Sequence, residues 1–314
     1  MSLKVLISAP YMQPVIDRFR PIFVENGIEI IVPPVQERLE ESDLLQWMSD
    51  IDGVICGDDR FTERVLRSSP RLKVISKWGT GIDSIDRKTC QQLGIALCNT
   101  PNAFSEPLAD SVMGYVLCFA RNLLGMDRLM KEGLWQKLPG RSLKECTLGV
   151  IGVGNVGKAV IRRAKAFGMP LLGNDIVKMP EDFLARAGIR MVPLEALLKK
   201  SDFISINCDL NPTSRHLIAA EEFSLMKNSA ILINTARGPI VDEQALIKAL
   251  DGKTIAGAAL DVFETEPLPM DSPLRQMRNV LLASHNANSS PEAWERVHLN
   301  TIHNLLEVLK GCRS

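Results

Sequence analysis

The stretch that decides the fold is Thr147-Leu148-Gly149-Val150-Ile151-Gly152-Val153-Gly154-Asn155-Val156-Gly157, a short apolar run that leads into a glycine-rich turn. Helical spacing follows over residues 158–167, so the glycines stand between a strand and a helix, as G-x-G-x-x-G requires. Gly152 permits a tight turn, Gly154 lets the backbone approach a pyrophosphate, and Gly157 lets helix and strand pack closely. The amides and positive dipole of the helix start, at Asn155 and Val156, then face the phosphates. The pattern predicts a dinucleotide-binding loop, although a glycine-rich turn without a ligand has the same glycines.

An acidic residue follows the glycine-rich loop at the distance that recognition of the adenosine ribose requires. Asp175 ends the next predicted strand, 18 residues after Gly157, where a carboxylate accepts hydrogen bonds from the adenosine ribose hydroxyls. A carboxylate there repels a 2′-phosphate, so we expect NAD as the cofactor in preference to NADP. Lys178 lies close in sequence, and its positive charge would weaken the preference for NAD over NADP. The simpler alternative is that Asp175 is only a solvated charge at a strand end.

Two series of short apolar runs alternate with amphipathic stretches, which is typical of parallel strands joined by crossover helices. They predict an α/β protein with two doubly wound parallel-sheet lobes, a Rossmann lobe inserted in a flavodoxin-like lobe. We expect a substrate domain at residues 1–100 plus 286–314 and a dinucleotide-binding domain at residues 101–285. Residues 106–131 have helical spacing and predict one long connecting helix. A last helix is expected from the Ser290 cap and Pro291, with Trp294, Val297, Leu305 and Leu309 on its buried stripe. The predicted strands are residues 4–8, 29–32, 53–56, 73–76 and 96–99, then 148–152, 171–175, 203–207, 230–234, 256–261 and 280–283.

Composition excludes several classes of function. The chain has 314 residues, of which 46% are hydrophobic, enough for a large core. Lys plus Arg equals Asp plus Glu at 37 each, so no excess positive charge favours nucleic acid or an anionic membrane. The first residues show no basic region followed by an apolar region, and we expect a cytoplasmic protein with reduced thiols and no metal. The seven cysteines form no C-x-x-C pair and stand at positions 56, 90, 98, 118, 146, 208 and 312.

Three polar residues follow three different strands of the second series. Arg237, Glu266 and His285 stand just past the strands that end near residues 234, 261 and 283, at the edge where ligands bind in open parallel sheets. An arginine can hold a carboxylate with two hydrogen bonds, and a histidine can move a proton near neutral pH. A glutamate beside the imidazole stabilises its charged form. The set suits hydride transfer between a 2-hydroxy and a 2-keto acid, although each residue alone can equally be an ordinary surface charge.

Together these residues make the chain resemble the D-isomer-specific 2-hydroxyacid dehydrogenase family from about residue 50 to the end. The resemblance implies that Arg237, Glu266 and His285 are catalytic and that amides around Trp78, Gly79, Thr80 and Gly81 hold the substrate carboxylate. It also implies cofactor contacts from Pro212, Thr235 and Ala236, with Asp261 near the nicotinamide carboxamide. Family members are usually dimers joined through the cofactor lobe and an arm, here residues 101–145, and they bind substrate between lobes that close. The matching segments are Lys77–Asp86, Asn99–Pro101, Gly152–Gly157, Pro212–Ile218, Asn234–Gly238 and Asp261–Pro267.

The chain departs from the family pattern at several points. Ser284 replaces the usual proline before the histidine, residues 286–290 lack the usual glycine-containing turn, and Asp209 stands where many members have proline. Cys56 occupies the region where phosphoglycerate-oxidising members often carry an arginine, with Arg60 nearby.

The expected substrates are 3-phosphoglycerate, or glyoxylate and hydroxypyruvate. Formate dehydrogenases of this fold carry glutamine at the position of Glu266, so the glutamate argues against formate dehydrogenase activity. The alternative from another class is the family's corepressor branch, in which NADH binding gates association with peptide partners.

Overall fold

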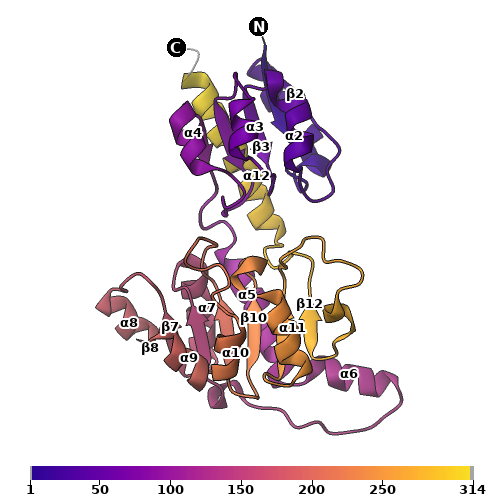
Figure 1. Cartoon of the computed structure of the whole chain (residues 1–314), viewed down its shortest axis with the longest axis vertical. Helices are drawn as coiled ribbons and strands as arrows, with labels where there is room; N and C mark the ends of the chain where they lie inside the picture. Colours follow the sequence, from indigo (N-terminus) through magenta and orange to yellow (C-terminus); the bar gives the residue numbers. More distant parts are fainter. Residues whose placement is uncertain (1, 312–314) are drawn as a thin grey trace. The chain divides into compact units, whose positions relative to one another are not determined.

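The computed structural model describes residues 2–311, and these form two compact units, each built on its own parallel sheet (Figure 1). Unit 1 comprises residues up to Phe104 together with those from Ser290 onward, and unit 2 comprises Ser105–Ser289. The division therefore falls about four residues beyond each of the two crossings expected from the sequence, at 100/101 and 285/286. Met1, Cys312 and the last two residues of the expected substrate domain lie outside the described residues.

Unit 1 is a five-stranded sheet with the order β2-β1-β3-β4-β5, and every pairing is parallel. This is the flavodoxin-like order of a doubly wound fold. All five expected strands are confirmed to within one residue, because each is a short apolar run bounded by polar or turn residues. The strands are β1 (Leu3–Ile7), β2 (Ile28–Ile31), β3 (Gly53–Cys56), β4 (Val74–Lys77) and β5 (Ala96–Cys98), and the α-helices between them are α1 (Ile16–Glu25), α2 (Glu41–Trp47), α3 (Glu63–Arg67) and α4 (Arg87–Leu93).

The chain's last helix completes unit 1. α12 (Pro291–Gly311) begins at the proline expected from the sequence, and the Ser290 hydroxyl accepts a hydrogen bond from the Ala293 amide at 3.4 Å. Its buried stripe packs against β3, β4 and β5 and includes Val297, Leu305 and Leu309. Trp294 is only partly buried, and its ring lies 5.1 Å from that of Tyr11.

Unit 2 is a seven-stranded parallel sheet with the order β12-β11-β10-β9-β6-β7-β8. Counted from its first strand, this is the Rossmann order 3-2-1-4-5-6 with one more strand at the end. The six expected strands are again confirmed to within one residue. The seventh, β8, was not predicted, because its three residues, of which Arg190 is exposed, carry too little apolar pattern. The strands are β6 (Leu148–Ile151), β7 (Leu171–Asn174), β8 (Ile189–Met191), β9 (Phe203–Ile206), β10 (Ile231–Asn234), β11 (Gly257–Leu260) and β12 (Val280–Leu282).

The prediction of one long helix over residues 106–131 is wrong. The segment forms α5 (Ser105–Ala120) and α6 (Leu123–Lys131), separated by a break at Asn122. Asn122 has a left-handed backbone with φ +51°, and its side-chain amide donates to the Pro139 carbonyl at 2.6 Å. A left-handed residue ends a right-handed helix, and asparagine is one of the few side chains that adopts it readily. The other helices of unit 2 are α7 (Asn155–Ala166), α8 (Glu181–Ala187), α9 (Leu194–Lys200), α10 (Ala220–Leu225) and α11 (Glu243–Asp251).

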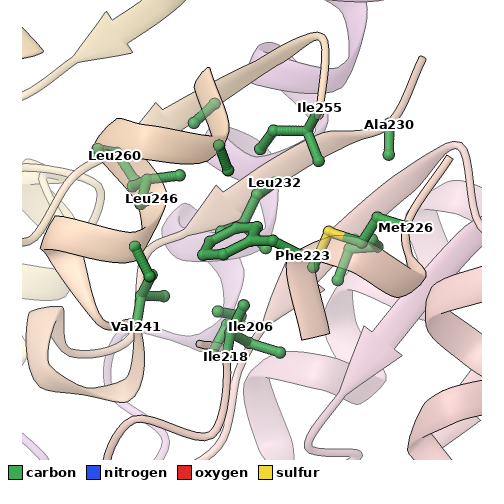
Figure 2. Packing of buried hydrophobic residues seen from close by; sticks show 14 of the residues in the cluster. Ile206, Ile218, Phe223, Met226, Ala230, Leu232, Val241, Leu246, Ile255 and Leu260 are labelled. Carbon is green, nitrogen blue, oxygen red and sulfur yellow. The ribbon is translucent and has the colours of Figure 1, made fainter. Parts of the chain in front are cut away.

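Helices cover both faces of the unit 2 sheet, so its strands are buried on both sides. Successive residues of β10 illustrate this, because Leu232 belongs to one hydrophobic cluster and Ile231 and Ile233 to the other. In the first cluster the Phe223 ring of α10 lies among the side chains of β10, α11 and their neighbours (Figure 2). This packing fixes the carboxyl ends of the strands, where the candidate site residues follow. Among the described residues, none of the helices combines the length and apolar character that spanning a bilayer requires.

Candidate active site

The glycine-rich loop between β6 and α7 has the shape that its sequence predicts. Gly152 has φ +85°, and a Cβ there would lie 2.6 Å from the Cys208 amide nitrogen. A Cβ on Gly157 would lie 2.1 Å from the Gly152 carbonyl oxygen, so any side chain would push helix and loop apart. A Cβ on Gly154, in contrast, would meet no atom within 4 Å. Gly152 and Gly157 are therefore needed for packing, whereas Gly154 leaves open space at the loop for a ligand to approach.

Asp175 directly follows β7 and connects it to this loop. One carboxylate oxygen accepts a hydrogen bond from the Val153 amide at 2.6 Å, and the other accepts one from the Val177 amide at 2.8 Å. The side chain is partly exposed, so the carboxylate is held in a defined position without being removed from solvent. Asp175 is thus a fixed acidic group next to the glycine-rich loop.

Two further predicted cofactor residues, Thr235 and Ala236, directly follow β10. Thr235 is 6% exposed, and its hydroxyl is buried without a hydrogen-bond partner within residues 2–311. Buried hydroxyls are normally paired, so this oxygen is suited to a partner supplied by a bound molecule. The amide of the neighbouring Ala236 donates to the Asn234 side chain at 3.1 Å, which fixes the turn.

Pro212 lies exposed in the loop after β9. The Asn211 side-chain oxygen accepts from the Thr213 amide at 2.8 Å, and the Ser214 hydroxyl donates to the Asp209 carbonyl at 2.6 Å. The loop is therefore preformed. With the open space at Gly154 and the unpaired Thr235 hydroxyl, these residues fit a nicotinamide dinucleotide.

Arg237 lies in a turn that is packed tightly against the segment after β11. The Arg237 guanidinium donates a hydrogen bond to the Ala236 carbonyl at 2.9 Å. The backbone carbonyl of Arg237 accepts a hydrogen bond from the Asn234 side-chain amide at 2.9 Å. A Cβ on the next residue, Gly238, would lie 1.9 Å from the Phe263 carbonyl carbon and oxygen. Only glycine allows this approach, so Gly238 determines how the Arg237 turn sits on the segment that leads to Glu266.

The Glu266 carboxylate connects that segment to His285. One oxygen lies 3.0 Å from His285 Nδ1, and the other accepts a hydrogen bond from the Phe263 amide at 2.9 Å. The side chains are 22% exposed for His285 and 17% for Glu266, so solvent screens the pair only in part. The structure thus brings together two residues that stand 19 positions apart in the sequence, with the orientation that carboxylate support of an imidazole requires.

Asp261 has partners in the His285 segment itself. It is fully buried, and its two carboxylate oxygens accept hydrogen bonds from the Asn286 and Ala287 amides at 2.8 and 2.9 Å. Burial raises the pKa of this carboxyl group, and the two amide hydrogen bonds act in the opposite direction. The contact with the nicotinamide carboxamide that the resemblance implies for Asp261 stays a prediction.

The predicted substrate loop lies in unit 1, directly after β4. The Trp78 amide donates to the Cys56 carbonyl at 2.8 Å, and the Gly79 carbonyl accepts from both the amide and the hydroxyl of Thr100 at 2.9 Å. Within residues 2–311 the amides of Gly79, Thr80 and Gly81 have no hydrogen-bond partner. Successive unpaired amides form a site for an anion. No local sequence pattern signals that Thr100 holds this loop, because the contact joins residues 21 positions apart.

One set of side-chain contacts beside Glu266 was not predicted from the sequence. His216 Nε2 lies 2.6 Å from a Glu264 carboxylate oxygen, and the Glu264 amide donates to the Glu243 carboxylate at 3.2 Å. The pKa of Glu243 is raised, first by burial and then by the charges of Glu264 and Glu266. These contacts join the loops after β9 and β11 to the first residue of α11, and no local sequence pattern signals pairing across 48 positions.

Residues 113–287 match the family described as "D-isomer specific 2-hydroxyacid dehydrogenase, NAD binding domain". The chain belongs to this family. It is 38% identical over 275 residues to a glyoxylate reductase of Korarchaeum cryptofilum, and the match covers 85% of this chain and 82% of that protein. It is also 38% identical over 277 residues to a D-3-phosphoglycerate dehydrogenase of Methanocaldococcus jannaschii, covering 87% of this chain but 52% of that protein.

Solved structures of the family share the architecture. The D-lactate dehydrogenase of Aquifex aeolicus, determined with NAD and lactic acid, superimposes with a TM-score of 0.88 at 29% identity and covers 98% of this chain and 96% of that chain. The resemblance read from the motifs is thereby confirmed, and so is the fold class. The chain is therefore an oxidoreductase of the D-2-hydroxyacid dehydrogenase type that uses a nicotinamide cofactor.

Proposed function

We propose that this D-2-hydroxyacid dehydrogenase reduces glyoxylate or hydroxypyruvate with NADH to the corresponding 2-hydroxy acid. The observation that carries the proposal is the Glu266–His285 pair at 3.0 Å, formed beside the Arg237 turn in unit 2. The match to the glyoxylate reductase covers 82% of that protein, against 52% of the D-3-phosphoglycerate dehydrogenase, which supports this substrate class over 3-phosphoglycerate. Cys56 also supports it, because a buried thiol at the end of β3 offers no charge to a substrate phosphate.

His285 is the proposed acid and base. Its Nδ1 faces Glu266, which assigns proton exchange with the substrate to Nε2. Because the carboxylate favours the imidazolium form, His285 is poised to donate a proton to the carbonyl oxygen as that oxygen gains negative charge. A bound reduced nicotinamide supplies the hydride to the carbonyl carbon. In the oxidative direction the neutral imidazole removes the hydroxyl proton instead.

Arg237 is the proposed carboxylate ligand in unit 2. A guanidinium offers two parallel N–H groups to a carboxylate and polarises a carbonyl oxygen next to it. In unit 1, the unpaired amides of Gly79, Thr80 and Gly81 are proposed to donate hydrogen bonds to the oxygens of a carboxylate. In unit 2, Arg237 orients the 2-oxo acid, whereas His285 handles the proton.

NAD is the proposed cofactor in preference to NADP. Asp175 is held by the Val153 and Val177 amides next to the glycine-rich loop, so its negative charge is fixed where a 2′-phosphate would be repelled. Gly152, Gly154 and Gly157, with the α7 start at Asn155 and Val156, are proposed to hold the pyrophosphate, and Thr235, Ala236 and Pro212 to contact the nicotinamide half.

A homodimer is proposed from the arm of unit 2. α6 and the loop after it expose large apolar side chains, of which Trp135 is 84% exposed and Leu124 53% exposed. Exposed apolar groups that cluster on one segment indicate a protein interface. Sedimentation should give a dimer for the wild-type chain and a monomer for Trp135→Glu with Leu124→Glu; a monomeric wild-type chain would contradict the proposal.

The experiment that tests the function follows NADH absorbance with a panel of 2-oxo acids. We expect turnover with glyoxylate and hydroxypyruvate, and little with 3-phosphohydroxypyruvate. Arg237→Ala should abolish carboxylate recognition while leaving the Kd for NADH nearly unchanged. Tight NADH binding without turnover of any 2-oxo acid would refute the proposal and favour the corepressor-like alternative. Equal losses of NADH affinity and turnover in Arg237→Ala would refute the role of that residue.

A further inference from the structure

A buried hydrogen bond joins the substrate loop of unit 1, residues 78–81, to the chain's last helix. The Trp78 indole Nε1 donates to His298 Nδ1 of α12 at 2.9 Å, across 220 positions of sequence. Trp78 is 4% exposed and His298 is 3% exposed, so solvent hardly competes for either group. Because Trp78 directly precedes the three unpaired amides, this contact connects α12 to the proposed carboxylate site.

The surroundings of His298 favour the ring form that this hydrogen bond requires. Nδ1 accepts a hydrogen bond only when the ring is neutral and carries its proton on Nε2. Burial lowers the pKa of His298, while the Glu295 charge opposes this effect and the Arg18 charge adds to it. The fold therefore favours the neutral ring, which gives the Trp78 indole a permanent acceptor.

Aromatic rings surround the pair within unit 1. The rings of Tyr11 and Phe104 lie 5.3 and 5.6 Å from the Trp78 ring, and the Phe19 ring lies 5.6 Å from the His298 ring. Because this packing is largely apolar, an indole N–H that lost its acceptor would either stay buried and unpaired or force the side chain to move. Either result disturbs the backbone that leads into the substrate loop.

The substrate loop is also held further along. The amide and the hydroxyl of Thr100 both donate to the Gly79 carbonyl at 2.9 Å. A second path leads from α12, because the Asn304 side chain donates to the Asn99 carbonyl at 3.2 Å and the Asn99 side chain donates to the Thr80 carbonyl at 2.7 Å. Gly79 lies between these contacts with φ +132°, a conformation that glycine adopts readily. The direction of the three amides thus depends on contacts on both sides of Gly79.

We propose that His298 is a positioning residue for the substrate carboxylate. Through the Trp78 indole it holds the amides of the substrate loop in the arrangement that binds the carboxylate oxygens, so it acts through another residue. The inference rests on the proposed function, because it takes these amides as the carboxylate site of unit 1. Loss of this hold should weaken binding of the 2-oxo acid without changing its reduction once bound, which gives a higher KM at an unchanged kcat.

The test compares His298→Phe with His298→Asn. Phenylalanine keeps a ring but removes the acceptor, whereas the asparagine oxygen stands near the position of Nδ1 and accepts the indole proton. In His298→Phe the KM for glyoxylate should rise about tenfold, with kcat and the Kd for NADH each changed by less than about threefold. His298→Asn should restore KM to within about threefold of the wild type. The matched control is His303→Phe, the same substitution at an exposed position of α12, which should leave all three values unchanged.

Trp78→Phe removes the donor of the same hydrogen bond. It should raise the KM for glyoxylate by a similar factor, and it tests the contact even if His298→Phe fails to fold. In the double variant Trp78→Phe with His298→Phe, KM should rise no further than in the worse single variant, because both changes remove one interaction. Independent, multiplying effects on KM would overturn the proposal.

Two measurements need no turnover. The chain has four tryptophans, and Trp78→Phe identifies the Trp78 signal among the indole N–H resonances. That proton should exchange with deuterium at least about tenfold faster in His298→Phe than in the wild type, and His298→Asn should slow it again. Oxamate, an unreactive analogue of a 2-oxo acid, should bind the NADH-loaded His298→Phe protein about tenfold more weakly than the NADH-loaded wild type.

The outcomes separate this inference from the proposed function. A folded His298→Phe protein with wild-type KM and wild-type oxamate affinity would overturn the positioning role. Losses of kcat and of NADH affinity as large as the rise in KM would also overturn it, because a general loss of structure affects all three. Absence of turnover by the wild type would instead contradict the proposed function, while the oxamate and exchange measurements would still decide whether His298 holds the loop.

Discussion

Gly238→Ala tests how closely the Arg237 turn must fit the segment before Glu266. The added Cβ would lie 1.9 Å from the Phe263 carbonyl atoms, whereas ordinary contact begins at 3.4 Å, so the two backbones must separate by about 1.5 Å (3.4 minus 1.9). Neither partner is a flexible side chain, because the contact joins two stretches of backbone. Overpacking of this kind costs about 1–3 kcal/mol of folding free energy. A displacement of about 1 Å at a reacting group costs about 10²-fold in rate, so kcat/KM should fall by at least that factor.

The assay measures NADH oxidation with glyoxylate, the Kd for NADH, and thermal unfolding, for Gly238→Ala and a control. Gly114→Ala is the control, because its Cβ would meet nothing within 4 Å and alanine favours the interior of α5. The control should keep wild-type activity and melt at the same or a higher temperature. A folded Gly238→Ala protein with kcat/KM within about threefold of the wild type would refute the argument that this contact sets the Arg237 geometry.

Two further predictions concern single carboxylates. Asp175→Ser should lower the preference for NADH over NADPH by about tenfold or more, because about 1.4 kcal/mol of repulsion corresponds to a tenfold change; an unchanged ratio of the two kcat/KM values would contradict the role of Asp175. Asp59 of unit 1 is buried, and burial raises its pKa to about 6 although Leu39 and Ser8 donate hydrogen bonds to it. Because the folded-state pKa lies above the unfolded value, the ionised carboxylate destabilises the fold at high pH, and this cost disappears as the pH falls through about 6 toward 4. Denaturant unfolding of Asp59→Asn and wild type should therefore differ more in favour of the variant at pH 8 than at pH 5, by about 1.4 kcal/mol; a pH-independent difference would contradict the raised pKa.

Local pattern predicted most of the fold. The eleven expected strands were found to within one residue, since parallel strands buried on both faces are short apolar runs with turn residues on each side. The exceptions have physical reasons. β8 is too short to carry a pattern, and the break between α5 and α6 depends on a single left-handed residue, Asn122, that helical spacing does not reveal.

The candidate site could be predicted only in part. Residue types past the strand ends pointed to Arg237, Glu266 and His285, and the structure brings Glu266 and His285 into contact. The sequence could not reveal the contacts between loops. Examples are the close approach of Gly238 to the Phe263 backbone and the hydrogen bond from the Asn286 amide to the Asp261 carboxylate. These depend on distances between segments far apart in the chain, for which one sequence carries no signal.

Glu266→Gln is the most direct test of the central claim, that a carboxylate-supported imidazole moves the proton. Glutamine keeps the length of the side chain, removes the charge that lies 3.0 Å from His285 Nδ1, and replaces one of the two acceptor oxygens with a donor. The apparent pKa of kcat/KM for glyoxylate reduction should fall by about one unit or more, because an adjacent opposite charge shifts a pKa by about 1–3 units. Glu264→Gln, whose carboxylate contacts His216 instead, should leave the profile in place. If the Glu266→Gln and wild-type pH profiles superimpose while both proteins turn over, the proton is not carried by this pair and the account is wrong.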